Sequence, residues 1–285
     1  MHRSIRLSAL VLLVCACGRE RPRDAAPSNA PPAQSPSGTE LAYTATDYGF
    51  SGPSQVPAGT VTFTLKNAGK EPHHLVVLRL EQGRTYDSLV AALRNPGPPP
   101  AWMHPVSGPN GISAGEEANA ELVLEPGPHA VVCFVPTVEG IPHFAKGMIS
   151  PLEVTAGDGA PPAELPPADV VVTLSDYTFT MSAPLTSGRH VIEVRNGASQ
   201  MHEVVLARLR PGKTAAQLAE YEIGGRKGEE PGTYIGGASP MGPGDHARFV
   251  VDLPPGEYGL ICFVPDAGDG KPHTAHGMIK DLTVS

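Results

Sequence analysis

The feature that most constrains the fold of this chain is an internal repeat. Residues of the first half recur in the second half at a fixed offset of 129 positions, as Cys133 recurs at Cys262. The offset becomes 130 for the residues that follow, as from Met148 to Met278, because the second copy has one extra residue after Cys262. A constant register over so long a span indicates that one folding unit has been duplicated. The fold must therefore be one that a segment of roughly 115 residues can form twice.

The local pattern of each copy predicts β-strands. Short runs alternate between apolar and polar residues and are bounded by Gly, Pro or Asn, which is typical of strands. The chain contains 32 Gly and 32 Pro, and both residue types disfavour helix interiors. We predict strands at residues 60–66, 75–78, 121–124, 130–134, 189–195 and 247–253. The sequence therefore predicts an all-β fold made of two tandem Greek-key β-sandwiches.

One short helix is expected as an insertion in each copy. Thr85 is positioned to cap a helix over residues 86–94, and Thr214 to cap one over residues 215–221. Leu89 and Leu93 would lie on the same face of the first helix and turn it towards the core.

The N-terminus has the pattern of an export signal. Arg3 and Arg6 precede an apolar run of ten residues, which is too short to span a bilayer. The small residue before Cys17 resembles a bacterial lipobox, which would make Cys17 the lipidated first residue of the mature protein. An ordinary signal peptide cleaved after Ala16 is the alternative. We expect a protein of the bacterial cell envelope, anchored to the membrane by lipid and facing the periplasm or the cell exterior.

Two segments rich in Pro and Ala divide the chain further. We expect a signal peptide at 1–16, a lipidated tether at 17–39, a first domain at 40–156, a linker at 157–168 and a second domain at 169–285. The formal net charge is −8 at pH 7. A general nucleic-acid binder would carry the opposite sign, so we expect no nucleic-acid partner.

Each copy contains the same four metal-ligand residue types in the same order. They are His73, Cys133, His143 and Met148 in the first copy, and His202, Cys262, His273 and Met278 in the second. Two imidazoles, a thiolate and a weak axial thioether are the ligand set of blue-copper electron-transfer sites. This set suits one-electron chemistry, because it is a compromise between the ligand preferences of Cu(I) and Cu(II). The sequence therefore predicts one type 1 copper per copy, two per chain.

The motifs around these residues resemble those of the cupredoxins, the small blue-copper β-sandwich family. Residues 67–73 (NAGKEPH) and 196–202 (NGASQMH) are similar to the family's first ligand segment. Residues 143–148 (HFAKGM) and 273–278 (HTAHGM) match its His-x-x-x-Gly-Met ending. The resemblance implies cysteine thiolate and histidine ligands, with Met148 and Met278 as weak axial ligands that set the potential. It also implies redox partner proteins in the cell envelope. The gap from cysteine to the second histidine is longer than in the small carriers of the family.

Two further features were interpreted from the repeat. His74 aligns with Glu203, so His73 is the matching ligand and His74 is expected to face solvent or a neighbouring carboxylate. The loops at 96–111 and 231–244 are rich in Gly and Pro. They are interpreted either as a docking surface that covers the end of the protein at which copper is expected, or as solvated loops.

The residues beside the cysteines led us to expect an electron carrier and not an enzyme. Catalytic coppers between such domains use histidines flanking the cysteine, whereas Val132 and Phe134 flank Cys133 here, and the sequence contains no His-x-His pair. Two alternatives remain open beside electron transfer. One is a cupredoxin-like envelope binding module without a redox metal, and the other is a copper carrier or buffer.

Overall fold

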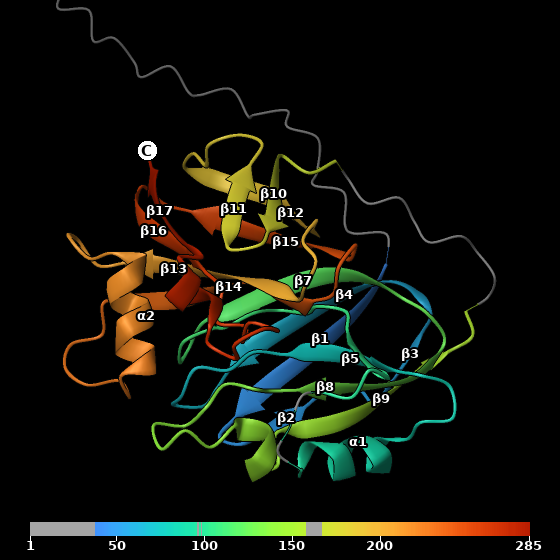
Figure 1. The fold of residues 1–285 in the computed structure, drawn as a ribbon. Coiled ribbons are helices and arrows are strands. Elements are labelled where there is room, and N and C mark those ends of the chain that lie inside the picture. The colour runs from blue at the N-terminus through green and yellow to red at the C-terminus, as the bar shows by residue number, and fades with distance from the viewer. Residues whose placement is uncertain (1–37, 96, 98, 158–166) are drawn as a thin grey trace, which may run out of the picture. The chain divides into compact units, whose positions relative to one another are not determined.

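Strands make up most of the secondary structure in the computed structural model, which describes residues 38–95, 97, 99–157 and 167–285 (Figure 1). The first half contains β1 (Thr39–Thr46), β2 (Gly49–Ser51), β3 (Gln55–Pro57), β4 (Gly59–Asn67), β5 (Val76–Leu80), α1 (Tyr86–Leu93), β6 (Met103–Pro105), β7 (Glu117–Leu124), β8 (Gly127–Val132) and β9 (Ile149–Thr155). The second half contains β10 (Val170–Ser175), β11 (Thr178–Met181), β12 (Gly188–Asn196), β13 (His202–Leu209), α2 (Ala215–Ile223), β14 (Gly232–Met241), β15 (His246–Leu253), β16 (Gly256–Ile261) and β17 (Ile279–Val284). Short 3-10 helices, η1 (His143–Lys146) and η2 (His273–His276), precede the last strand of each half.

Each half is a sandwich of two sheets. In the first half, β2-β1-β4-β7 faces β3-β9-β8-β5-β6, and in the second half β11-β10-β12-β15 faces β14-β13-β16-β17. The inward side chains of both sandwiches, such as Phe63 and Leu174, are fully buried. The predicted fold class, all-β with two β-sandwiches and one short helical insertion in each, is confirmed.

Both helices begin where the sequence predicts. The Thr85 side chain accepts a hydrogen bond from the Ser88 N–H at 3.2 Å, and the Thr214 side chain accepts one from the Gln217 N–H at 3.2 Å. Each cap satisfies one of the N–H groups that the first helical turn leaves without a partner.

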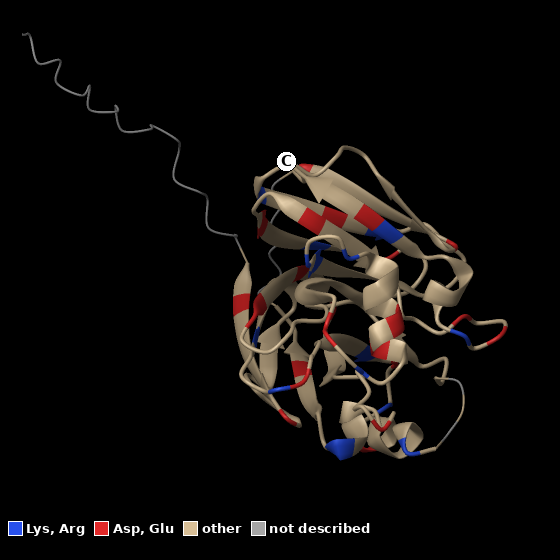
Figure 2. Ribbon diagram, turned by 90° about the vertical axis from the view of Figure 1, so that its left-hand side faces the viewer, with Lys and Arg blue, Asp and Glu red and all other residues tan. Residues whose placement is uncertain are grey.

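Charged residues are interspersed over the described part of the chain. Lys and Arg as well as Asp and Glu are scattered over many of the strands and loops (Figure 2). None of the helices in the described ranges is long and apolar enough to cross a membrane. The predicted signal peptide and Cys17 lie outside the described residues.

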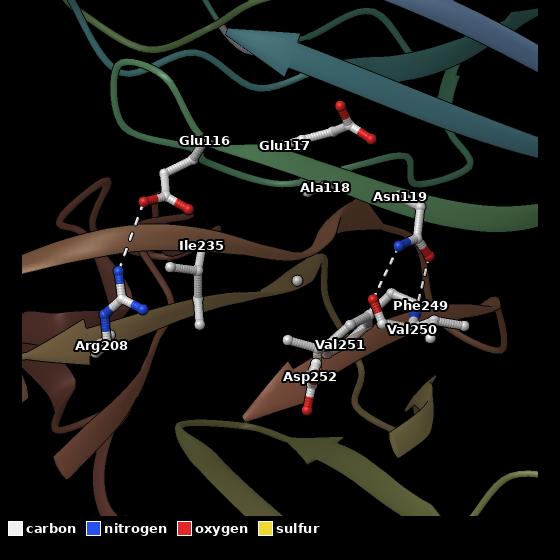
Figure 3. Close-up of a pocket in the computed structure, with 11 residues that line it drawn as sticks. Glu116, Glu117, Ala118, Asn119, Arg208, Ile235, Phe249, Val250, Val251 and Asp252 are labelled. Carbon is white, nitrogen blue, oxygen red and sulfur yellow. Dashed lines mark hydrogen bonds and ion pairs between the residues drawn. The ribbon is translucent and has the colours of Figure 1, made fainter. Parts of the chain in front are cut away.

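A continuous sheet joins the two halves. Strands β7 and β15 pair antiparallel, so that eight strands from both halves form one sheet. The Asn119 side chain donates to the Val250 carbonyl and accepts from the Val250 N–H, both at 2.8 Å (Figure 3). The described residues accordingly fall into one compact unit.

A second contact joins the halves through residues 106–112, which follow β6, and residues 235–241, which form the end of β14. We call these two segments the paired loops. Pro109 forms a β-bridge with Ala238, its equivalent at an offset of 129, and Ile112 forms one with Ile235. The two segments therefore pair antiparallel in a way that respects the repeat. Part of the loops that we interpreted as docking or solvated segments is instead buried between the halves, as Asn110 and Ser239 show with no exposed surface.

Candidate metal centres

The ligand-type residues of both halves come from equivalent places in the fold. His202 begins β13, and His73 lies three residues before the equivalent strand β5. The cysteines directly follow β8 and β16, the second histidines begin η1 and η2, and the methionines directly precede β9 and β17. All eight side chains are fully buried. The fold therefore gathers residues that are up to 76 positions apart in sequence at one end of each sandwich.

Backbone hydrogen bonds close the segment that carries three of the four residues. The Cys133 N–H donates to the Met148 carbonyl at 3.1 Å, and the Met148 N–H donates to the His143 carbonyl at 3.0 Å. The equivalent bonds measure 3.2 and 3.0 Å in the second half. Gly147 and Gly277 end the 3-10 helices at φ angles of 110° and 90°, a left-handed conformation that favours glycine.

An asparagine at the end of a strand positions the first histidine of each half. The Asn67 side chain donates to the carbonyls of Glu71 and Ile112, at 2.8 and 3.0 Å. The His73 N–H then donates to the same Ile112 carbonyl at 3.1 Å. Asn196 makes the two equivalent side-chain bonds in the second half, both at 2.9 Å.

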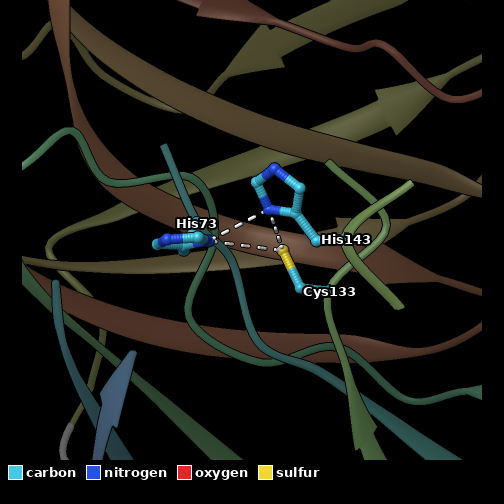
Figure 4. Close-up of side chains that lie close together, drawn as sticks. All are labelled: His73, Cys133 and His143. Atoms are coloured by element: carbon cyan, nitrogen blue, oxygen red, sulfur yellow. Dashed lines mark hydrogen bonds between the residues drawn. The ribbon is translucent and has the colours of Figure 1, made fainter. Parts of the chain in front are cut away.

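His73, Cys133 and His143 form what we call the first site (Figure 4). The Nδ1 atoms of the two histidines lie 3.1 Å apart. The Cys133 Sγ atom lies 4.0 Å from Nδ1 of His73 and 3.6 Å from Nδ1 of His143. Three potential donor atoms thus form a small buried triangle.

His202, Cys262 and His273 form the second site in the same way. The Cys262 Sγ atom lies 3.9 Å from Nδ1 of His202 and 3.3 Å from Nδ1 of His273. The two imidazole rings lie with their centroids 4.4 Å apart.

Carboxylates outside the triangle fix which histidine nitrogen faces the sulfur. Nε2 of His73 lies 2.8 Å from Asp47 Oδ1, and Nε2 of His143 lies 3.3 Å from Glu71 Oε2. A carboxylate accepts hydrogen bonds, so each Nε2 carries the proton and each Nδ1 presents its lone pair to the inside. Gly69 leaves room for this pairing, because a Cβ atom there would lie 2.3 Å from Asp47 Oδ1.

The second site shares only half of this arrangement. Nε2 of His202 lies 3.1 Å from Asp176 Oδ1, like its counterpart in the first site. Nε2 of His273 lies 3.8 Å from Asp266 Oδ2 and is a buried nitrogen without a hydrogen-bond partner among the described atoms. The two sites therefore differ in how their second histidine is held.

The donor geometry fits a small transition-metal ion. A metal bonded at about 2.0 Å to two nitrogens and about 2.3 Å to a sulfur, in a trigonal plane, spaces those atoms about 3.5 to 3.7 Å apart. The distances of 3.1 to 4.0 Å in the first site bracket that range. Without a cation, two lone pairs would face each other at 3.1 Å beside a sulfur atom, an arrangement that a bound metal relieves.

Burial sets the protonation of the donors. It lowers the pKa of His73 and of His143, and it lowers the pKa of His273 to about 4, so these imidazoles are neutral and able to bind a metal. It raises the pKa of the Cys133 thiol to about 12 and also raises that of Cys262. A metal must therefore displace a proton from each sulfur on binding.

The sequence interpretation of His74 is wrong. Its side chain is 7% exposed, and its Nε2 accepts the Phe134 N–H at 2.8 Å. Glu203 takes the same place in the second half and accepts the Phe263 N–H at 2.9 Å. The repeat showed that the two residues are equivalent, but their burial depends on the sheets that pack around them. Both hold the backbone directly after a cysteine.

Several residues around the sites were not anticipated from the sequence. They are Asp47, Tyr48, Glu71, Asp176 and Arg226. The recurrence of Asp47-Tyr48 at Asp176-Tyr177 was the available signal for the aspartates and tyrosines. Glu71 and Arg226 have no acidic or basic equivalent in the other copy, so no repeat pattern points to them.

No protein-family model matches the chain, and no curated protein matches it. Solved structures do. A reduced auracyanin from Roseiflexus castenholzii is 22% identical over 41% of this chain and 95% of its own, with a TM-score of 0.29. A blue copper oxidase from Nitrosomonas europaea is 17% identical over 87% of this chain and 85% of its own, with a TM-score of 0.24. A copper-containing nitrite reductase from Thermus scotoductus SA-01 is 13% identical over 86% of this chain, with a TM-score of 0.25, and this chain spans 61% of its length. These are likenesses of fold alone.

The expectation that this chain is not an enzyme is corrected by these comparisons. The structures that share its fold include a nitrite reductase and a blue copper oxidase, which are enzymes, beside the auracyanin. The residues that flank Cys133 and Cys262 argue only against a catalytic copper bound by histidines next to these cysteines. A fold common to carriers and enzymes does not exclude enzymatic activity.

Proposed function

We propose that this protein binds copper at both sites, each as a type 1 centre, and that it transfers single electrons. The observation that carries the proposal is the buried triangle of two inward-facing Nδ1 atoms and one Sγ atom, present in both halves. Nitrogen and thiolate donors in that number are the set used by blue-copper proteins.

In this proposal each half supplies one complete set of ligands. Cys133 and Cys262 supply the thiolates, while Met148 and Met278 are weak axial ligands. Bound copper would supply a centre that exchanges one electron between Cu(I) and Cu(II). The protein keeps water out, since every ligand side chain is fully buried. The closed backbone of the ligand segment keeps the donors in place, so that little rearrangement accompanies a change of charge.

The place of this function in the cell is part of the proposal. Lipidation at Cys17 would hold the protein in the bacterial cell envelope, facing the periplasm or the exterior. Its partners would be redox proteins of that compartment. The net charge of −8 favours partners other than nucleic acid.

The test is a visible absorption spectrum of the chain from Gly38 onward, taken after Cu(II) addition and removal of excess metal. We expect an intense thiolate-to-copper band that reductant bleaches. The Cys133→Ser and Cys262→Ser variants should each lose about half of it, and His104→Ala, which removes an exposed histidine outside both sites, should lose none. Absence of the band, with copper washing off, would contradict the proposal. Rapid transfer of copper to a chelator would instead indicate a carrier or buffer.

A further inference from the structure

Arg226 is a cation from the second half that reaches the first site. It lies three residues after α2, at a φ angle of 56°, and its side chain is only 11% exposed. Its Nε donates to Glu222 Oε2 at 2.8 Å, its Nη1 to Glu71 Oε2 at 3.0 Å and its Nη2 to the Pro136 carbonyl at 3.1 Å. All three nitrogens of the guanidinium thus have partners, as a largely buried charge requires.

Two of these partners, Glu71 and Pro136, adjoin the first site. Glu71 is the carboxylate that holds Nε2 of His143, and its other oxygen accepts the Tyr48 hydroxyl at 2.6 Å. Pro136 lies in the segment between Cys133 and His143, whose exposed tip carries Val138. One side chain from the second half therefore contacts both the carboxylate behind a ligand and the loop that carries it.

The second site has no equivalent of this arrangement among the described residues. The residue that corresponds to Glu71 is Gln200, whose amide donates to Asp266 Oδ2 at 3.0 Å. The residue that corresponds to Arg226 at an offset of 129 is Gly97, which has no side chain. One difference between the sites is thus an ionic contact across the two halves, which only the first site has among the described residues.

We infer that Arg226 is a positioning residue for the first site, through which the second half holds His143 in place and keeps the loop at Pro136 closed. The inference rests on the proposed function, because it assigns different behaviour to the two proposed metal sites. Partners of metal ligands that lie outside the first coordination sphere change metal affinity about 10- to 100-fold when they are removed. A fixed positive charge beside one site also disfavours the more highly charged state of a metal there.

The first measurement is the rate of metal loss to a chelator, made in two backgrounds of the chain from Gly38 onward. Cys262→Ser leaves only the first site, and Cys133→Ser leaves only the second. We expect Arg226→Gln to release Cu(II) or Co(II) from the first site about 10- to 100-fold faster and to leave the second site unchanged. The midpoint potential of copper at the first site should fall, with no change at the second.

Two further substitutions separate positioning from folding. Arg226→Lys keeps the positive charge but loses the planar guanidinium group with its several N–H donors. Its rate of metal release from the first site should therefore lie between those of the wild type and Arg226→Gln. Arg210→Gln is the matched control, because Arg210 is a half-exposed arginine of the same half that pairs with Glu229. If Arg226→Gln does not fold, Arg226→Lys and Glu71→Gln are compared in its place. Equal changes at both sites, or none at the first, would overturn the inference.

A metal-independent measurement keeps this inference separate from the proposed function. The alkylation rate of the single buried thiol in each background reports how often its loop opens. We expect Arg226→Gln to speed alkylation of Cys133 and not of Cys262. A protein that holds Co(II) but shows no blue copper band would contradict the proposed function alone. If wild type holds neither metal, alkylation decides the inference, and unchanged labelling of Cys133 would refute it.

Discussion

Asn110 is a buried amide of the first half whose hydrogen bonds serve the second half. Its Nδ2 atom lies 3.0 Å from Glu203 Oε2, 3.0 Å from the Val204 carbonyl and 2.9 Å from the Ala238 carbonyl. Glu203 is itself buried, and burial raises the pKa of its carboxyl to about 7. Asn110 therefore satisfies acceptors that water cannot reach.

Replacing Asn110 with alanine should cost about 2 kcal/mol of unfolding free energy, because it leaves buried acceptors without a donor. Urea unfolding followed by circular dichroism measures the change. Asn95→Ala is the control, since that exposed asparagine also donates to a carbonyl, that of Ala91, and its loss should cost under about 0.5 kcal/mol. Equal effects of the two substitutions would contradict the role assigned to Asn110.

Individual residues differ in how well their positions and roles could be predicted from the sequence. The repeat pointed to all eight predicted ligand residues because it preserves residue type and order, and the structure gathers the four histidines and two cysteines among them into two groups. His74 was misplaced because burial depends on packing. Arg226 and Asn110 were missed because their contacts join the two halves, and each has a chemically different residue at the equivalent position. Contacts that break the symmetry of a repeat cannot be found by comparing its copies.

At the scale of secondary structure, strands β12 and β15 are linked by a buried carboxylate. Glu193 is 5% exposed, pairs in register with Arg248 and receives hydrogen bonds from Arg195 and Arg248. Burial acts to raise the pKa of the Glu193 carboxyl, but the two arginines outweigh it and hold the pKa below its usual value. The ionised carboxylate therefore stabilises the folded state more than the unfolded one.

This contribution should depend on pH in a defined direction. It is fully present above the unfolded-state pKa of about 4.3 and is lost as the pH falls through the lower folded-state value. We expect Glu193→Gln to cost about 2 kcal/mol at pH 7 and progressively less at acidic pH. Unfolding free energies of both proteins between pH 7 and pH 3 test this. A difference that stays constant over that range would show that ionisation of Glu193 does not matter.

The ligand loops depend on a glycine in a left-handed conformation. Gly147 has a φ angle of 110° directly before Met148, and an added Cβ atom would meet only the Tyr48 carbonyl, at 3.8 Å. Gly147→Ala should therefore introduce backbone strain of about 1 kcal/mol without a steric clash, and weaken metal binding at the first site about fivefold. Gly140→Ala is a matched control, because Gly140 has a φ angle of 81° and open surroundings in the exposed part of the same loop. The prediction fails if both substitutions weaken binding equally.

The predictions of helices and strands were most accurate where neighbouring residues determine the secondary structure. The helix caps at Thr85 and Thr214 and the alternating strands follow from neighbouring residues, and the structure contains them. The paired loops were not predicted as such. Their partner is the equivalent segment of the other half, more than 120 positions away, and neither segment alternates strongly enough to indicate a strand.

At the scale of the whole molecule, the two halves share one interior. The largest buried cluster contains residues of both, such as Phe63 and Leu206, while two smaller clusters lie beside the helices α1 and α2. The joined sheet and the paired loops add hydrogen bonds across the same boundary. Separating the halves would expose this apolar surface and leave buried polar groups unpaired, which favours unfolding as one unit.

Trp102 allows this cooperativity to be tested from one side of the molecule. It is the single tryptophan of the chain, and it packs against the small cluster beside α1 in the first half. Leu218 is fully buried in the small cluster beside α2 in the second half. Leu218→Ala should cost about 2 to 5 kcal/mol. If the halves unfold together, Trp102 fluorescence will report the whole of that loss as a lower urea midpoint, coincident with circular dichroism. Halves that unfold independently would leave the Trp102 transition at its wild-type midpoint, while only part of the circular dichroism signal moved.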